Sequence, residues 1–270
     1  MVFSDLIKIF KNITYLGQVL DSSEVADREF RNRFSEETYL LEPCPNIAML
    51  LAYVALGKPL QRDSLAGAFT VGESKHKEKH PKEVWFFVNG ICTDANLAKL
   101  NGACLSELFS RKIQVIHNPT FGIIPDLAEC IFERTFDGFA PITAHLYNEV
   151  ISAMAKKQKV VIIGHSQGGI ITESLLKLFN INNIKCSNIE VYNFASAADE
   201  DLVVPGVYQE HFANENDFVS RVGILTATPQ HPVFVKESGA GHLLNRDYLE
   251  HFMLGKYCNK KSRLFGYLNK

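Results

Sequence analysis

Signals of several specialised protein classes are missing from this 270-residue sequence. Its 28 Lys and Arg residues are balanced by 30 Asp and Glu residues, so no overall positive charge favours nucleic-acid binding. No apolar run approaches the roughly 20 residues that a membrane-spanning helix needs. Internal repeats and low-complexity tracts are also absent. The 46% hydrophobic content therefore fits a globular protein that is long enough to bury a sizeable core.

Cysteine is sparse, and the six cysteines are widely spaced. None forms a C-x-x-C pair, which argues against a zinc ribbon or a thiol redox motif. Six are too few for a disulfide scaffold, so we expect mostly buried, reduced thiols. Lys8 and Lys11 interrupt the apolar N-terminal stretch, which is unlike a secretory signal. Both observations favour a cytoplasmic location, while signal-independent export and peripheral membrane association remain alternatives.

The first 82 residues differ in pattern from the rest of the chain. An amphipathic helix is predicted at the N-terminus and a second helix at 46–56, with a charged stretch at 21–37 between them. A polar connector at 75–82 follows, for which a patch that contacts anionic lipid headgroups is the alternative. We therefore predict an N-terminal helical extension over residues 1–82, packed against a catalytic domain over residues 83–270.

From residue 83 onward, short apolar runs alternate with helical patterns. The predicted strands are 84–88, 113–116, 160–163, 189–194, 207–212 and 232–235. The predicted helices are 95–109, 125–132, 142–155, 170–179 and 242–254. Near-continuous apolar strands that alternate with helices indicate an α/β fold, with a mostly parallel sheet and helices on both faces. Functional residues in such sheets gather beyond the carboxyl ends of the strands.

The third of these strands runs directly into the segment 164–169, which reads GHSQGG. This G-x-S-x-G pattern between a strand and a helix predicts a tight turn that presents the Ser166 hydroxyl as a nucleophile. A side chain at Gly164 or Gly168 would clash with a neighbouring strand or helix. The helix that follows begins near Gln167, whose backbone N–H is predicted to bind an oxyanion. A glycine-rich turn that serves packing alone is the alternative.

A nucleophilic serine needs a base, and the base needs a group that orients it. Asp217 follows the strand 207–212, and His242 lies on a glycine-rich loop after the last strand, in the chain order serine, acid, histidine. We predict Asp217 as the acid and His242 as the base. The alternatives are the neighbouring acids and the other histidines, namely Glu215, Asp199, Glu200, His165, His231 and His251.

A second oxyanion donor is expected from the loop that follows the strand 84–88. Gly90 permits a close backbone approach there, and the N–H of Ile91 is the preferred donor. The N–H of Cys92 is the alternative, because spacing alone does not settle a shift of one residue. An ordinary turn at Asn89-Gly90 is the simpler reading of the same residues.

The stretch from Val84 to Leu254 resembles the α/β-hydrolase superfamily, on its lipase and serine-esterase side. The resemblance is carried by the strand ending in Asn89-Gly90, the GHSQGG turn, the segment 214–219 (NENDFV) and Gly241-His242. It departs from the family at Asn89, where a His-Gly pair is more usual. The resemblance implies an α/β-hydrolase fold, a Ser166-Asp217-His242 triad, and ester hydrolysis without a cofactor.

The sequence thus predicts a serine esterase or lipase that cleaves an apolar acyl ester through an acyl-enzyme. A thioesterase or acyltransferase could use the same triad, and a non-catalytic binding protein could keep the fold alone. The Phe-rich segment 119–141 is a candidate lid or acyl pocket, with ordinary helix packing as the alternative. Basic residues near both ends suggest peripheral membrane contact. No nucleic acid, cofactor or metal is predicted, and no oligomeric state is assigned.

Overall fold

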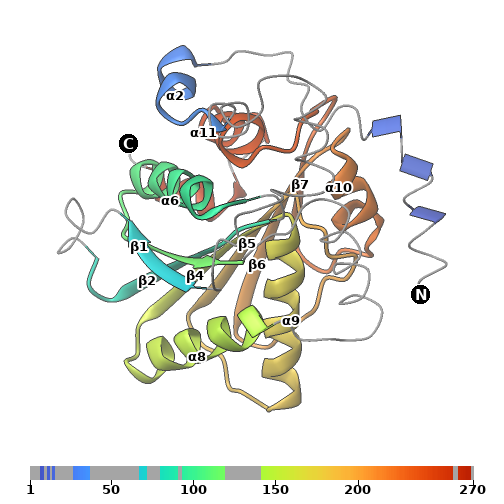
Figure 1. Cartoon of the computed structure of the whole chain (residues 1–270). Helices are drawn as coiled ribbons and strands as arrows, with labels where there is room; N and C mark the ends of the chain where they lie inside the picture. The colour runs from blue at the N-terminus through green and yellow to red at the C-terminus, as the bar shows by residue number, and fades with distance from the viewer. Residues whose placement is uncertain are drawn as a thin grey trace, which may run out of the picture.

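The structure, a computed structural model, describes residues 7–8, 11–12, 14–15, 27–36, 67–71, 80–90, 93–118, 141–257 and 261–268. Within them a seven-stranded sheet has the order β1-β3-β2-β4-β5-β6-β7 (Figure 1). The strands are β1 (Gly67–Val71), β2 (Glu83–Val88), β3 (Ile113–His117), β4 (Lys159–His165), β5 (Ile189–Phe194), β6 (Val207–Asn214) and β7 (Val233–Lys236). β1 is antiparallel to β3, and all other neighbouring pairs are parallel. The predicted α/β fold with a mostly parallel sheet is confirmed.

The α-helices lie between and beside these strands. They are α2 (Arg28–Arg33), α6 (Ala95–Phe109), α8 (Pro141–Ala155), α9 (Gln167–Ile181), α10 (Phe218–Val222) and α11 (Glu250–Met253). Near the C-terminus a π-helical segment, η3 (Leu244–Leu249), leads directly into α11. Short 3₁₀ turns are η2 (Ile224–Thr226) and η5 (Leu264–Tyr267). Among the described residues, no helix combines the length and apolar character needed to cross a membrane.

The sheet begins earlier in the chain than the predicted boundary at residue 82. β1 lies within the region predicted as a helical extension, and it pairs with β3 so that Phe69 faces Val115. As an edge strand β1 has one neighbour, so its short GAFTV sequence lacks the long apolar run that marks the central strands. The stretch 21–37 also contains α2, whose N-cap is the Asp27 side chain. The predicted helices 46–56 and 125–132 lie outside the described residues.

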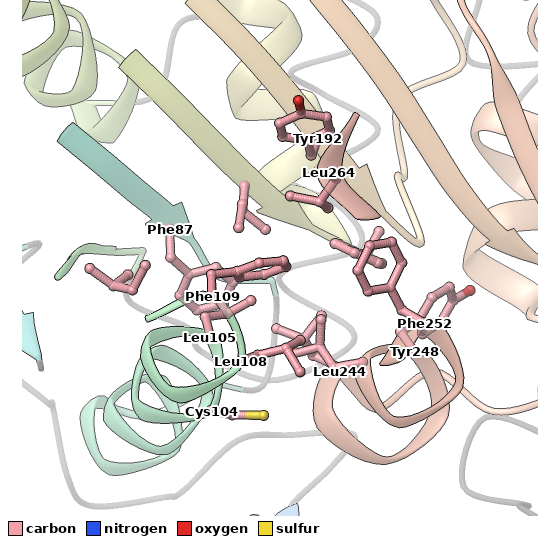
Figure 2. Close-up of a cluster of buried hydrophobic side chains, with 14 of the residues drawn as sticks. Phe87, Cys104, Leu105, Leu108, Phe109, Tyr192, Leu244, Tyr248, Phe252 and Leu264 are labelled. Atoms are coloured by element: carbon pink, nitrogen blue, oxygen red, sulfur yellow. The ribbon is translucent and has the colours of Figure 1, made fainter. Parts of the chain in front are cut away.

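Two apolar layers cover the sheet, one on each face. α6, η3 and α11 lie on one face, and α8 and α9 lie on the other (Figure 1). Figure 2 shows the first layer, where Phe109 of α6 and Phe252 of α11 meet beneath the strands. The rings of Phe194 on β5 and Phe212 on β6 stack with centroids 4.7 Å apart, and Phe252 packs edge-on against both. This layer ties the C-terminal helices to the central strands.

The N-terminal segment 27–36 is anchored to η3 and α11 through two buried carboxyl groups. Glu250 accepts a hydrogen bond from the Asp27 N–H at 2.5 Å and forms an ion pair with Arg31 at 3.2 Å. Glu36 accepts hydrogen bonds from the Asn245 and Arg246 N–H groups, at 2.9 and 3.2 Å. These N–H groups lie in the first turn of η3, where no intrahelical acceptor is available. The segment therefore caps the helical region that follows residue 242.

Burial raises the pKa of Glu36 to about 8. An unfolded glutamate has a pKa of about 4.3, so between these values the folded state keeps a proton that the unfolded state releases. The free energy of unfolding should therefore fall as pH rises from about 5 to 8, by at most about 1.4 kcal/mol per pH unit from this group.

Glu36→Gln keeps an oxygen acceptor but cannot ionise, so it should lack this pH-dependent decrease in the free energy of unfolding. Urea unfolding at pH 5, 6.5 and 8 tests the prediction. The stability of Glu36→Gln relative to the wild type should increase with pH. A difference that stays constant across this range would show that Glu36 does not titrate in this window.

Candidate active site

Ser166 stands at the sharp turn between β4 and α9. Its backbone has φ 58° and ψ −120°, a conformation that a non-glycine residue rarely adopts. Hydrogen bonds fix this turn on both sides: the Ser166 N–H donates to Phe194 O at 3.1 Å, and Ser166 O accepts from the Ala197 N–H at 3.0 Å. Strain of this kind persists where the surroundings enforce it and is concentrated at functional sites.

The glycines around Ser166 allow three backbone segments to come together. A Cβ at Gly168 would overlap the carbonyl oxygen of Val88 at the end of β2. A Cβ at Gly164 would overlap the side-chain oxygen of Asn193 on β5, and one at Gly90 would overlap Ser166 itself. Close packing of β2, β5 and α9 around the turn therefore requires glycine at these positions.

Ser166, His242 and Asp217 are hydrogen-bonded in series. The Oγ of Ser166 lies 2.9 Å from Nε2 of His242, and Nδ1 of His242 lies 2.8 Å from Oδ2 of Asp217. For a neutral imidazole, Nδ1–H donates to the carboxylate and Nε2 accepts the serine hydroxyl proton. Gly241 has φ 84°, and a Cβ there would overlap the Asp247 carboxylate, so only glycine suits the position before His242.

The Asp217 carboxylate is fully buried and accepts hydrogen bonds on both oxygens. Oδ1 caps α10 by accepting the Val219 N–H at 2.9 Å, and Oδ2 accepts from Tyr248 Oη at 2.6 Å and Ser220 Oγ at 3.1 Å. Burial opposes its ionisation, but the His242 charge and these hydrogen bonds outweigh burial and lower the pKa of Asp217. The carboxylate is therefore held in its charged form beside the His242 ring.

Asn214, the first residue of the NENDFV segment, holds the loop that precedes His242. Its Nδ2 lies 3.2 Å from Ala240 O and 3.3 Å from Gly241 O, and its Oδ1 accepts the Tyr257 hydroxyl at 2.7 Å. One buried amide at the end of β6 therefore fixes the position of the histidine loop relative to Asp217. Asn214 belongs to the predicted NENDFV motif, but the motif alone does not indicate this contact.

His165, the residue before Ser166, packs against His242. The two ring centroids are 4.9 Å apart, and Nε2 of His165 bonds to the backbone oxygen of His242 at 2.9 Å. Burial, with a smaller contribution from the neighbouring His242, lowers the pKa of His165 to about 3. His165 therefore stays neutral near pH 7 and donates through Nε2 to the histidine that it supports.

Gln167 begins α9 directly after Ser166, so its N–H is among the first-turn donors of the helix that lack an intrahelical acceptor. Its side-chain oxygen accepts a hydrogen bond from Asn118 at 2.7 Å. Asn89 in turn accepts the Asn118 N–H at 2.8 Å and donates to Asn118 O at 2.9 Å. Ile91 and Cys92, the alternatives for the second oxyanion donor, both lie outside the described residues.

Sequence reasoning missed Asn118 and Tyr248. Asn118 follows β3 directly, and a polar residue after a buried strand was the available signal. Tyr248 gave no signal, because it reaches Asp217 only through the folding of η3.

The alternative acids and bases have other partners. Asp199 pairs with Lys8 at 2.6 Å, Glu200 pairs with Lys177 at 3.0 Å, and Glu215 accepts the Ser238 N–H at 2.7 Å. His251 lies 3.1 Å from the Lys236 amine, and His231 contacts Asp201. Among the candidates in the described residues, Asp217 and His242 are the acid and histidine that are hydrogen-bonded in series with Ser166.

Comparison with family models matches residues 88–228 to the family described as "Putative serine esterase (DUF676)". The match covers more than half of the chain, and the chain belongs to this family. Family membership supports serine hydrolase activity and agrees with the α/β-hydrolase fold described above. A comparison with curated proteins found no match.

Solved structures of two esterases match this chain. The carboxylesterase EstE1, cloned from a metagenomic library, matches with a TM-score of 0.51 at 9% identity, over 93% of this chain and 100% of that chain. A structure of an arylesterase matches with a TM-score of 0.46 at 11% identity, over 90% of this chain and 99% of that chain. At these identities the likeness to EstE1 shows the α/β-hydrolase fold and not the substrate.

The close approach at Gly168 predicts a position-specific cost for an added methyl group. Gly168→Ala should lower the free energy of unfolding by about 1–3 kcal/mol or more, because the clash is with backbone that cannot move aside. Gly266→Ala is the matched control, since no atom lies within 4 Å of a Cβ at that position. Urea denaturation of both variants measures the difference. Equal stability of the two variants would contradict the packing described around the turn.

Proposed function

We propose that this protein is a carboxylic ester hydrolase in which Ser166, His242 and Asp217 form the catalytic triad. The observation that carries the proposal is the continuous hydrogen-bond series from the Ser166 hydroxyl to the buried Asp217 carboxylate. The strained serine turn at the start of a 15-residue helix supports it, because this geometry holds the Ser166 hydroxyl beside the first backbone donors of the helix. Membership of a serine esterase family supports the same reaction class.

The first chemical step is acylation of Ser166. Nε2 of His242 takes the hydroxyl proton as Oγ attacks the ester carbonyl carbon, forming a tetrahedral intermediate. Collapse of this intermediate breaks the bond to the leaving alkoxide, which receives the proton from His242. Water then attacks the acyl-enzyme, with His242 acting again as base and then as acid, and releases the carboxylic acid. Asp217 stabilises the imidazolium during both acylation and deacylation.

The negative charge on the carbonyl oxygen requires hydrogen-bond donors that are already in place. We assign this role to the N–H of Gln167 at the start of α9 and to the N–H of Ile91, with Cys92 as the alternative donor. The contacts of Gln167 with Asn118, and of Asn118 with Asn89, support the assignment, because they tie the start of α9 to the loops that follow β2 and β3.

The proposed substrate is an ester with an apolar acyl group. The support is the Phe-rich sequence of segment 119–141, which follows β3 in the chain; all but the last residue of this segment lies outside the described residues. Residues 83–270, together with β1, are proposed to form the catalytic unit. Peripheral membrane contact and a cytoplasmic location stay predictions. Lys8, expected near lipid headgroups, is paired with Asp199.

Labelling with a fluorophosphonate tests the nucleophile and the triad. The wild type should gain one covalent adduct, located at Ser166 by peptide mass mapping, and Ser166→Ala should gain none. Asp217→Asn should slow labelling by about three to four orders of magnitude, because it favours the wrong imidazole tautomer. A folded wild type that is not labelled would favour a non-catalytic binding protein and contradict the enzyme assignment.

A series of model substrates tests the acyl specificity. We expect kcat/KM for p-nitrophenyl esters to rise with acyl chain length from acetyl to octanoyl, because each buried methylene adds about 0.8 kcal/mol of transfer free energy. Matched acyl thioesters and an added alcohol acceptor serve as comparisons. A clear preference for thioesters, or transfer to alcohol instead of water, would replace the esterase assignment by a thioesterase or an acyltransferase.

A further inference from the structure

Away from Ser166, three side chains with metal-ligand chemistry come together. They are Asp201 in the loop between β5 and β6, His211 within β6, and His231 before β7. One ligand atom from each lies within 4.8 Å of the others. The sheet register aligns His211 with Asn193 and Asn193 with Gly164, so the cluster lies two strands from the serine turn, roughly 10 Å away. It is separate from the proposed triad.

The Asp201 carboxylate is fixed so that one oxygen faces both imidazoles. Oδ2 accepts the backbone N–H groups of Gln230 and His231, at 2.5 and 2.7 Å. Oδ1 lies 2.6 Å from Nδ1 of His231 and 3.3 Å from Nε2 of His211. A tetrahedral zinc ion with bonds of about 2.0–2.1 Å separates its ligand atoms by roughly 3.3 Å. A small rotation of the His231 ring would therefore bring the three ligand atoms to the spacing of such a site.

The charges around Asp201 favour a cation. The side chains of Asp201 and His211 are 0% exposed, and that of His231 is 14% exposed. Among the described residues no Lys or Arg forms an ion pair with Asp201. Glu173 adds a second buried carboxyl group: Oε2 accepts the Leu202 N–H at 3.2 Å, and Oε1 has no hydrogen-bond partner in this part of the structure. The two imidazoles are the ion-pair partners of Asp201 among the described residues, and a divalent ion held by all three groups would add positive charge beside this buried carboxylate.

We propose that Asp201, His211 and His231 bind one Zn²⁺ ion, with water at the fourth position on the partly exposed side of His231. Two imidazole nitrogens and one carboxylate oxygen suit zinc, whereas Ca²⁺ and Mg²⁺ prefer oxygen ligands. The ion would join the loop before β6, β6 itself and the segment before β7. Because β6 leads to Asp217, the ion would stabilise the strand that carries the proposed catalytic acid.

The three ligands are 10 and 20 residues apart in the chain, so no short motif marks them in the sequence. Sequence reasoning accordingly predicted no metal. The site arises because His211 and the residues before β7 are neighbours in the sheet, where the His211 N–H donates to Pro232 O at 2.9 Å.

Isothermal titration of the chelator-treated full chain with ZnCl₂ tests the proposal. The wild type should bind one equivalent of zinc and show a higher Tm when zinc is present, and CaCl₂ should produce neither effect. His231→Gln should weaken zinc binding at least tenfold and abolish the Tm increase. This variant is chosen because the ring is partly exposed, so its loss should leave the fold intact.

His145→Gln, on α8 and outside the cluster, is the matched control and should bind zinc like the wild type. Asp201→Asn is the second test variant and should also lose binding. Circular dichroism and the Tm without zinc establish that each variant is folded. Absence of zinc binding by the wild type would overturn the proposal. Unchanged binding by folded His231→Gln and Asp201→Asn would overturn it as well, since zinc would then lie elsewhere.

Discussion

The arrangement of the candidate site depends on the buried charge of Asp217. A carboxylate without solvent is unfavourable unless donors surround it, and here they come from α10, η3 and the histidine loop. α10 begins directly after Asp217, whereas His242 and Tyr248 follow it by 25 and 31 residues in the chain and are brought back to the end of β6 by the fold. The same contacts that stabilise the carboxylate also set the direction of the His242 ring. Stability and proposed catalysis therefore depend on one local network.

The N-terminal segment extends this network. Glu36 and Glu250 connect residues 27–36 with η3 and α11, which follow the proposed catalytic histidine. β1 adds an antiparallel edge to the sheet from the same N-terminal region. The region predicted as a helical extension packed against the catalytic domain contributes both a strand and a cap. Its described parts act as components of the fold that positions His242.

Most of the central sheet was predictable because its strands are buried on both faces and read as apolar runs. The strand β5 and the helix α6 have the bounds that the sequence predicts. β1 was not, because an edge strand needs less apolar sequence and is defined by its partner. The triad residues could be proposed from chain order and from their positions after strands. Tyr248 and the Asp201 cluster could not, because only the folded chain brings these distant residues to their partners.

The central claim is that Ser166 is the nucleophile of an ester hydrolase and that the hydrogen-bonded series makes it reactive. Steady-state hydrolysis of p-nitrophenyl butyrate by the wild type and by Ser166→Ala tests it most directly. We expect kcat/KM to fall at least a thousandfold in the variant, since removal of a triad serine can cost about a millionfold in kcat. Hydrolysis by folded Ser166→Ala at the wild-type rate would contradict the account.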